Sequence, residues 1–222
     1  MASAADFFAD ARAHMADSQL RPNKVTDPRI LQAMRSLPRE RFVPAAAASL
    51  AYADEDVPLG KGRVLMEPMV LARLLQVAAP VAGELALVVG AGTGYGAAVL
   101  AACGVRVTAL EEDPDLFAQA QALLATLAPG VTLVAGPLAA GWPAGAPYDV
   151  ILIEGAVHQV PPAIARQLRV EGGRLVGVIG GVDRTNQAIL AEATPAGLRA
   201  APIFDCGTPL LPSLIPAPAF VF

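Results

Sequence analysis

Four glycines separate a short apolar run from an alanine-rich stretch in the segment LALVVGAGTGYGAAVLAAC, residues 85–103. The run LALVV predicts a buried strand, and the stretch that follows predicts a helix. Glycine loses more backbone entropy on folding than other residues, so the missing side chains at this junction must serve a purpose. The possible purposes are a tight turn, close packing of the helix on the strand, or a ligand that lies against bare backbone.

An acidic residue ends the next predicted strand, in the segment VRVTALEED. Glu111 follows Gly90 by about 20 residues, and ligands of open α/β sheets bind beyond the carboxyl ends of the strands. A carboxylate in that position can accept hydrogen bonds from both hydroxyls of a ribose. Glu111 and the loop of Gly90, Ala91, Gly92 and Gly94 therefore indicate a cofactor that contains adenosine.

Two kinds of cofactor are compatible with this loop. Gly92, Gly94 and Ala97 satisfy a loose form of the dinucleotide pattern GxGxxA, so NAD stays possible. Gly90 directly after LVV favours the E/DxGxG pattern of enzymes that use S-adenosyl-L-methionine (SAM), although Val88 takes the place of the usual acid. We expect bare backbone of the loop to lie under the amino-acid end of SAM. A side chain that fills this hollow, or a Glu111 that points away from it into solvent, would overturn the assignment.

Composition and charge exclude several classes of protein. The chain has 222 residues, of which 55% are hydrophobic, and a net charge of −4 with no basic stripe, so we expect no nucleic-acid partner. An uninterrupted apolar run of membrane-spanning length is missing, as is a secretory signal pattern, so we expect no membrane association and a cytoplasmic location. Cys103 and Cys206 belong to no CxxC pair, so no metal site is expected.

Apolar runs alternate with helical stretches from Leu85 onward. Runs of Val, Ile and Leu without polar alternation are typical of parallel strands covered by helices on both faces. We therefore expect an α/β fold with a doubly wound, mostly parallel sheet in a single domain, with residues 81–222 as its Rossmann-like core. The predicted strands are residues 85–89, 105–110, 131–135, 148–153 and 174–179, and the predicted helices are residues 95–103, 114–127 and 161–168.

The first 80 residues predict a helical cap with a polar loop. Apolar spacing predicts helices over residues 7–20 and from Pro28 to Leu37, the second capped by Asp27 or Thr26. A further helix begins at Pro68, after an irregular segment over residues 51–63. Near the other end of the chain, a strand–turn–strand pair around Pro195–Gly197 predicts an antiparallel edge.

Several blocks of the sequence resemble the protein-L-isoaspartate O-methyltransferases in the same order. They are DSQLRPNKVTDPRILQAMRSLPRERFVP, AYADEDVPLG, VVGAGTGYGAAVLA, GWPAGAPYDVILIEGA and PPAIARQLRVEGGRLVGVIG. The resemblance implies a seven-stranded class I methyltransferase fold and transfer of a methyl group from SAM to a carboxylate of damaged aspartyl residues in peptides or proteins. It also implies that Gly90, Gly92 and Gly94 hold SAM and that Glu111 holds its ribose.

The substrate loop departs from the family pattern QTISxP. Here the loop reads RVLMEP, with Val64 in the Thr position and Met66 in the Ser position. Both hydroxyl donors are absent, and Glu67 would repel an anionic acceptor if it pointed inward. Leu65, Met66, Glu67 and Pro68 are the expected acceptor-binding residues. Glu67 directly precedes the helix that begins at Pro68, so its negative charge could alternatively stabilise the N-terminus of that helix.

Two further segments also depart from the family. The G-D-G segment reads GPL, which leaves the backbone amide of Leu138 to meet the adenine. In EGAVHQV, Glu154 is a candidate cofactor contact and His158 a candidate base for a neutral acceptor, or both face solvent. No catalytic side chain is identified, since an acceptor carboxylate is already ionised at neutral pH. A different acceptor, such as a small molecule, or SAM binding without turnover are the alternatives.

Overall fold

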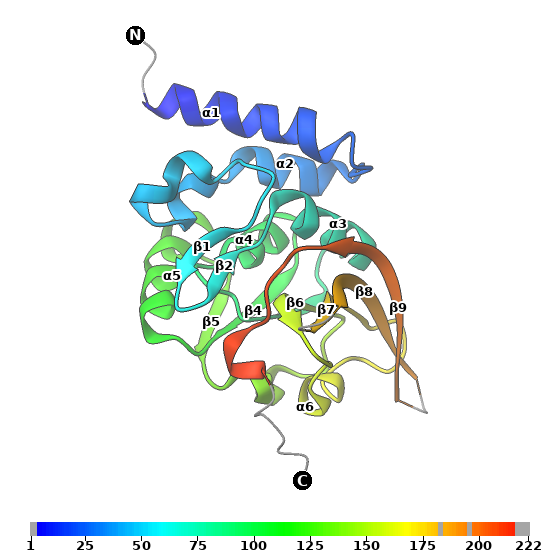
Figure 1. Ribbon diagram of the computed structural model, residues 1–222. Helices are drawn as coiled ribbons and strands as arrows, with labels where there is room; N and C mark the ends of the chain where they lie inside the picture. The colour runs from blue at the N-terminus through cyan, green and yellow to red at the C-terminus, as the bar shows by residue number, and fades with distance from the viewer. Residues whose placement is uncertain (1–3, 182–183, 195–196, 216–222) are drawn as a thin grey trace.

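A single mixed sheet forms the centre of the computed structural model, which describes residues 4–181, 184–194 and 197–215. Seven strands lie in the order β5-β4-β3-β6-β7-β8-β9 (Figure 1). The first five are parallel to one another, and β8 is antiparallel to both β7 and β9, which confirms the doubly wound, mostly parallel sheet. The strands are β3 (Leu85–Val89), β4 (Arg106–Glu111), β5 (Thr132–Ala135), β6 (Val150–Val157), β7 (Arg174–Gly181), β8 (Arg184–Thr194) and β9 (Gly197–Cys206).

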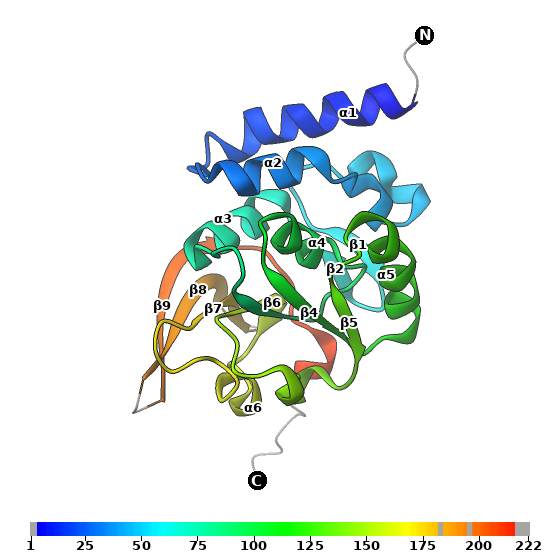
Figure 2. The same cartoon turned by 180° about the vertical axis from the view of Figure 1, so that it is seen from behind.

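Helices cover both faces of the sheet. The helical cap lies beyond one face, and α6 lies on the other (Figures 1 and 2). The alternation along β3 gives each face its core: Ala86 and Val88 join one apolar cluster, whereas Leu87 and Val89 join the other. The helices are α1 (Ala4–Met15), α2 (Pro28–Ser36), α3 (Pro68–Ala78), α4 (Tyr95–Ala102), α5 (Pro114–Leu127) and α6 (Pro162–Ala165), and α1 continues as a π-helix over Ala16–Leu20.

The helix-start signals of the cap act as the sequence predicts. Asp27 accepts a hydrogen bond from the Arg29 amide, and Pro28 occupies the first turn of α2. Pro68 likewise begins α3. Glu67 stands at the N-cap of α3, but its side chain makes no capping hydrogen bond.

A β-hairpin replaces part of the irregular segment that was expected over residues 51–63. Its strands are β1 (Val57–Gly60) and β2 (Arg63–Leu65), and Figure 1 shows the hairpin in cyan beside α5. The two turn residues, Lys61 and Gly62, have φ angles of 51° and 73°, the backbone that a tight hairpin turn requires. The expectation of an irregular segment was wrong there because each strand is too short to show alternation.

Two other boundaries differ from the predictions. The helix expected over residues 161–168 ends at Ala165, since Leu168 forms a parallel bridge with Tyr148 and so leaves the helical path. Strand β6 runs on to Val157, past the expected end at Ile153, because Ala156 pairs with Val178 beyond a register shift. Both differences arise from pairing between segments that are distant in the sequence.

The hairpin of β8 and β9 forms one edge of the sheet, antiparallel as expected. Of the turn predicted around Pro195–Gly197, Pro195 and Ala196 lie outside the described residues. Pro202 in the outer strand β9 faces Ile189, next to a register shift in the pairing.

Within the described ranges, no helix is long and apolar enough to cross a membrane. The same ranges hold no group of three or more His, Cys, Asp or Glu side chains that could bind a metal ion.

Candidate cofactor site at the carboxyl edge of the sheet

The glycine loop lies at the point where the direction of winding reverses. From β3 the chain proceeds outward through β4 to β5, then returns to β6 on the other side of β3. In an open α/β sheet, crossovers that diverge in this way leave a crevice beyond the carboxyl ends of the strands. The glycine loop follows β3, and Glu111 is the last residue of β4. The topology therefore brings the loop and Glu111 to this crevice.

The glycines are needed for the path of the backbone itself. Gly90, Gly92 and Gly94 have φ angles of 74°, 58° and 95°, a region that other residues rarely adopt. The amides of Gly90 and Ala91 both donate to the Leu110 carbonyl at 3.0 Å, which turns the chain back over β4. The tight turn is therefore one reason for the glycines.

Glu111 is fully buried at the end of β4 and is held by the loop above it. Its Oε2 accepts from the Gly92 amide at 2.6 Å, and its Oε1 accepts from the amides of Glu112 and Asp113 at 2.9 Å. Arg63 adds two parallel hydrogen bonds, from Nη1 to Oε1 at 2.8 Å and from Nη2 to Oε2 at 3.0 Å. Glu111 thus lies beside the glycine loop as predicted, but an arginine occupies both of its oxygens.

Side chains fill the hollow that was expected to be open above the loop. The Arg63 Nη2 donates to the Gly90 carbonyl at 2.9 Å, and a Cβ placed on Gly90 would lie 3.2 Å from that nitrogen. A Cβ on Gly92 would lie 3.2 Å from Cδ1 of Leu59. In this conformation the expectation of bare, open backbone was wrong, because the hairpin β1–β2 lies over the loop.

Ion pairs fix the tip of this hairpin to the start of α5. Lys61 Nζ lies 2.8 Å from Oδ2 of Asp113 and 2.6 Å from Oδ2 of Asp115. Neither the hairpin nor its two basic residues, Lys61 and Arg63, was predicted from the sequence. The signal was the segment GKGR, a glycine-rich turn whose two basic residues, Lys61 and Arg63, meet the acids of EEDPD.

Glu154 lies in the buried strand β6 against the start of α4, with 8% of its surface exposed. The Gly96 amide hydrogen-bonds to its carboxyl group, and a Cβ at Gly96 would overlap that group. Its Oε2 has no hydrogen-bond partner among the described residues. Burial raises the pKa of Glu154 to about 8, although Arg63 and Arg39 act in the opposite direction.

We expect Glu154→Gln to weaken the dependence of stability on pH. The folded-state pKa of about 8 lies above the ordinary value of 4.5, so the folded protein holds a proton that the unfolded chain releases between these values. Stability therefore falls as the pH rises through this window. Melting temperatures at pH 5 and pH 8 test this: the drop between them should be larger for the unsubstituted protein than for E154Q, and equal drops would contradict the assignment.

The expected acceptor loop is held in place from its buried side. Leu65 and Met66 are buried, and Met66 belongs to the apolar core. Arg39, also buried, donates from Nη2 to the Met66 carbonyl and from Nε to the Ala51 carbonyl, both at 2.6 Å. Arg39 is a positioning residue that the sequence analysis missed, since its partners follow it by 12 and 27 residues.

Glu67 faces other acids at the start of α3. Burial, followed by repulsion from Asp54 and Asp56, raises the pKa of Glu67 to about 7, while Arg39 acts to lower it. The Asp56 carboxylate accepts from the Glu67 amide at 2.7 Å. The loop thus lacks the two hydroxyls of the family pattern, at Val64 and Met66, and its Glu67 lies in an acidic group with Asp54 and Asp56.

The remaining candidates divide between two places. Leu138 is buried beside the glycine loop, where its Cδ1 would lie 3.5 Å from a Cβ on Gly90, but its amide donates to Oε2 of Glu112 at 3.2 Å. His158 lies in a hollow of about 300 Å³ that also includes Ala139 and Ser213. The structure therefore brings Leu138 to Glu111 and the glycines, and places His158 among segments that do not contribute to the acceptor loop.

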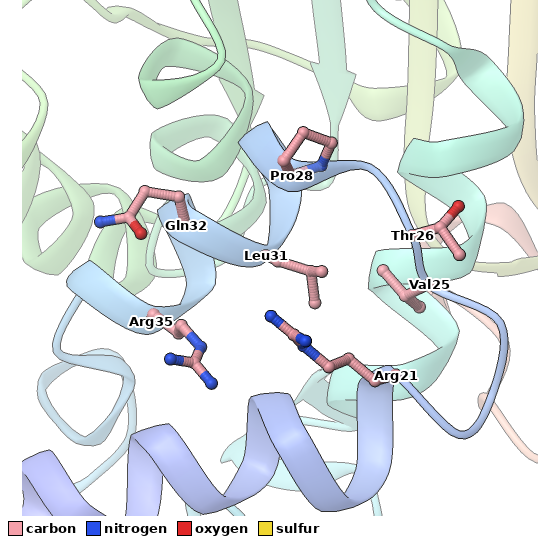
Figure 3. Close-up of a pocket in the computed structure, with 7 residues that line it drawn as sticks. All are labelled: Arg21, Val25, Thr26, Pro28, Leu31, Gln32 and Arg35. Carbon is pink, nitrogen blue, oxygen red and sulfur yellow. The ribbon is translucent and has the colours of Figure 1, made fainter.

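A separate hollow of about 500 Å³ lies on the helical cap (Figure 3). Arg21 and Arg35 extend into the same space between the helices, with Leu31 beside them. Asp17 forms ion pairs with both arginines and so offsets part of their charge. This hollow contains none of the residues expected to bind the cofactor or the acceptor.

Known proteins resemble the chain over most of its length. The family model for protein-L-isoaspartate(D-aspartate) O-methyltransferase matches residues 12–195. The protein-L-isoaspartate O-methyltransferase of Methylorubrum populi is 45% identical over 170 residues, which are 77% of this chain and 80% of the relative. That of Koribacter versatilis is 38% identical over 90% of this chain and 89% of the relative.

Solved structures agree with the fold. A protein-L-isoaspartate O-methyltransferase superposes with a TM-score of 0.79 and 25% identity, over 91% of this chain and 67% of the other. A Plasmodium falciparum protein solved with S-adenosyl-L-homocysteine superposes with a TM-score of 0.74 and 18% identity, over 91% and 98%. The sheet order, the glycine loop with its buried acid and these similarities lead to one conclusion: the chain belongs to the protein-L-isoaspartate O-methyltransferase family.

Proposed function

We propose that the chain is a SAM-dependent methyltransferase whose acceptor is the carboxylate of an isoaspartyl residue in a peptide or protein. The observation that carries this is the Glu111 carboxylate bonded to the Gly92 amide at the reversal of the winding. An acid joined to a glycine loop at this point is suited to hold a ribose above bare backbone. Family membership supports the same assignment.

The residues present fit SAM once Arg63 leaves the hollow. Oε2 of Glu111 would then keep only the Gly92 amide and would have room for a ribose hydroxyl, whereas Oε1 would still accept from the amides of Glu112 and Asp113. Withdrawal of Leu59 with the hairpin would also uncover Gly92. Leu138 would supply an apolar contact, and Glu154 in β6 packs against the start of α4, next to the loop. When bound, SAM supplies a methyl group on a positively charged sulfur. The residues of this chain bind, orient the acceptor and exclude water, and the ionised acceptor requires no base.

Two measurements test the proposal. Calorimetry should detect binding of SAM and S-adenosyl-L-homocysteine. Labelled SAM should then transfer its methyl group to an isoaspartyl peptide and not to the matched aspartyl peptide. Absence of binding at millimolar concentrations would overturn the cofactor assignment, whereas binding without transfer would overturn the acceptor assignment alone.

The acidic surroundings of the loop favour a second acceptor class. Glu67 lies with Asp54 and Asp56, and Met66, in the Ser position of the family pattern, is buried without a hydroxyl. A neutral or cationic acceptor would meet no repulsion there. The same labelling assay with uncharged small molecules and basic peptides would distinguish this class, since their methylation would exceed that of the isoaspartyl peptide.

We expect methylation of an isoaspartyl peptide to improve as the pH falls from 8 to 6. The pKa of Glu67 is about 7, so the group is charged above this value and neutral below it. Loss of one repulsive charge contributes about 1 kcal/mol, or about fivefold in the KM for an anionic acceptor. KM values at pH 6 and pH 8 check this, and Glu67→Gln should remove most of the difference. An unchanged pH dependence in E67Q would show that another group is responsible.

We also propose that residues 1–80 act as the cap that positions the acceptor loop and that residues 81–222 act as the cofactor-binding core of one domain. The cytoplasmic location and the lack of a nucleic-acid partner stay predictions from composition.

A further inference from the structure

Arg63 is a buried guanidinium in the middle of the proposed cofactor site. Only 7% of its side chain is exposed, and its partner Glu111 is fully buried. Its two terminal nitrogens make three hydrogen bonds, two to the Glu111 carboxylate and one to the Gly90 carbonyl. Both partners are groups that the proposed function assigns to SAM.

Arg63 and the cofactor cannot occupy these groups together. The guanidinium saturates the Glu111 oxygens that would accept from the ribose, and Nη2 lies in contact distance of any atom placed on Gly90. Leu59 blocks Gly92 in the same way. Because both side chains come from the hairpin β1–β2, one movement of the hairpin would clear both positions.

We propose that Arg63 competes internally for Glu111 and thereby sets the affinity for SAM, which binds only after the hairpin β1–β2 withdraws Arg63 from the site. The inference rests on the proposed function, since it concerns access to the same site. The apparent affinity of a ligand is reduced by the fraction of molecules in the competent state, so the closed pair weakens binding without any change in the contacts to SAM.

The tip of the hairpin, residues 59–63, has the features of a segment that can open, whereas Val57 and Leu65 at the outer ends of its strands stay buried in the apolar core. The hairpin's strands contain four and three residues, and isolated two-stranded hairpins are marginally stable. The Lys61 side chain that fixes its tip is 59% exposed, and exposed ion pairs contribute little. The buried pair of Arg63 and Glu111 therefore makes the strongest polar contact between the hairpin and the loop.

Calorimetry with S-adenosyl-L-homocysteine on three proteins tests the proposal. They are the unsubstituted chain, Arg63→Gln, which keeps a polar side chain but loses the charge, and Arg174→Gln as a matched control. Arg174 pairs with Glu84 at the amino ends of strands β7 and β3, away from the carboxyl ends where the cofactor site lies. We expect R63Q to bind at least about tenfold more tightly than the unsubstituted chain and R174Q to bind as the unsubstituted chain does.

The outcomes separate this inference from the proposed function. Equal or weaker binding by R63Q, with binding by the unsubstituted chain intact, would overturn the internal competition alone. Failure of all three proteins to bind at millimolar ligand would overturn the proposed function and the inference with it.

A measurement on the unsubstituted chain decides the matter if R63Q does not fold. Amide hydrogen exchange over residues 59–63 should rise when S-adenosyl-L-homocysteine saturates the protein, because the tip of the hairpin leaves its contacts with the loop. Unchanged or slower exchange in this segment at saturation would overturn the proposal.

Discussion

Replacement of Glu111 by alanine is expected to lower the free energy of unfolding by about 3–5 kcal/mol, because Arg63 would keep a buried charge without a partner. The three backbone amides that donate to Glu111 would lose their acceptor as well. For a chain of this length the melting temperature should fall by roughly 10 °C. Binding of SAM should weaken at least tenfold, or about 1.4 kcal/mol.

Glu84→Ala provides the control for this prediction. Glu84 forms an ion pair with Arg174 at 2.6 Å, but both side chains are 20% exposed. Water can therefore solvate the remaining charge of Arg174, and the free energy of unfolding should fall by only about 1 kcal/mol. Urea unfolding of both variants measures the difference, and equal losses would show that the burial of the Arg63–Glu111 pair is unimportant.

Gly94→Ala is expected to reduce stability by about 2–4 kcal/mol and to weaken SAM binding at least tenfold. The backbone φ of 95° disfavours a side chain, and the added Cβ would lie 3.0 Å from Cδ1 and Cγ of Leu124 in α5. Gly94 is also the N-cap of α4, so relief of the contact would displace the loop that should hold SAM. Urea unfolding and calorimetry measure the two effects.

Gly83→Ala separates backbone strain from crowding. Gly83 has a similar φ of 88°, but its added Cβ would meet no atom within 4 Å. The loss should be limited to about 1–2 kcal/mol, with SAM binding unchanged. If G83A and G94A were equally stable, contact with Leu124 would not contribute to the effect at Gly94.

The sheet and the position of Glu111 could be predicted because their signals are local. Runs of five residues such as LALVV and VTALE are apolar enough to indicate buried strands on their own. An acid at the end of one parallel strand must then lie beside the loop that follows the neighbouring strand. Proline and aspartate at the start of α2 are equally local. These features need no knowledge of distant partners.

The contents of the site could not be predicted in the same way. Arg63 meets Glu111 across 48 residues of sequence, and Arg39 meets the acceptor loop across 27. A basic residue in a polar segment gives no sign of which acid it will meet or whether the pair will be buried. The hollow over the glycines therefore looked open from the sequence, although the hairpin fills it.

Pro202 in the outer strand β9 has a consequence for encounters between copies of the chain. An unpaired strand edge presents free amides and carbonyls that can template growth of the sheet into a neighbouring molecule. Proline offers no amide there, and the adjacent register shift bends the ladder out of a straight line. Around Pro202, this margin of the sheet is thereby a poor template for a strand from a second molecule.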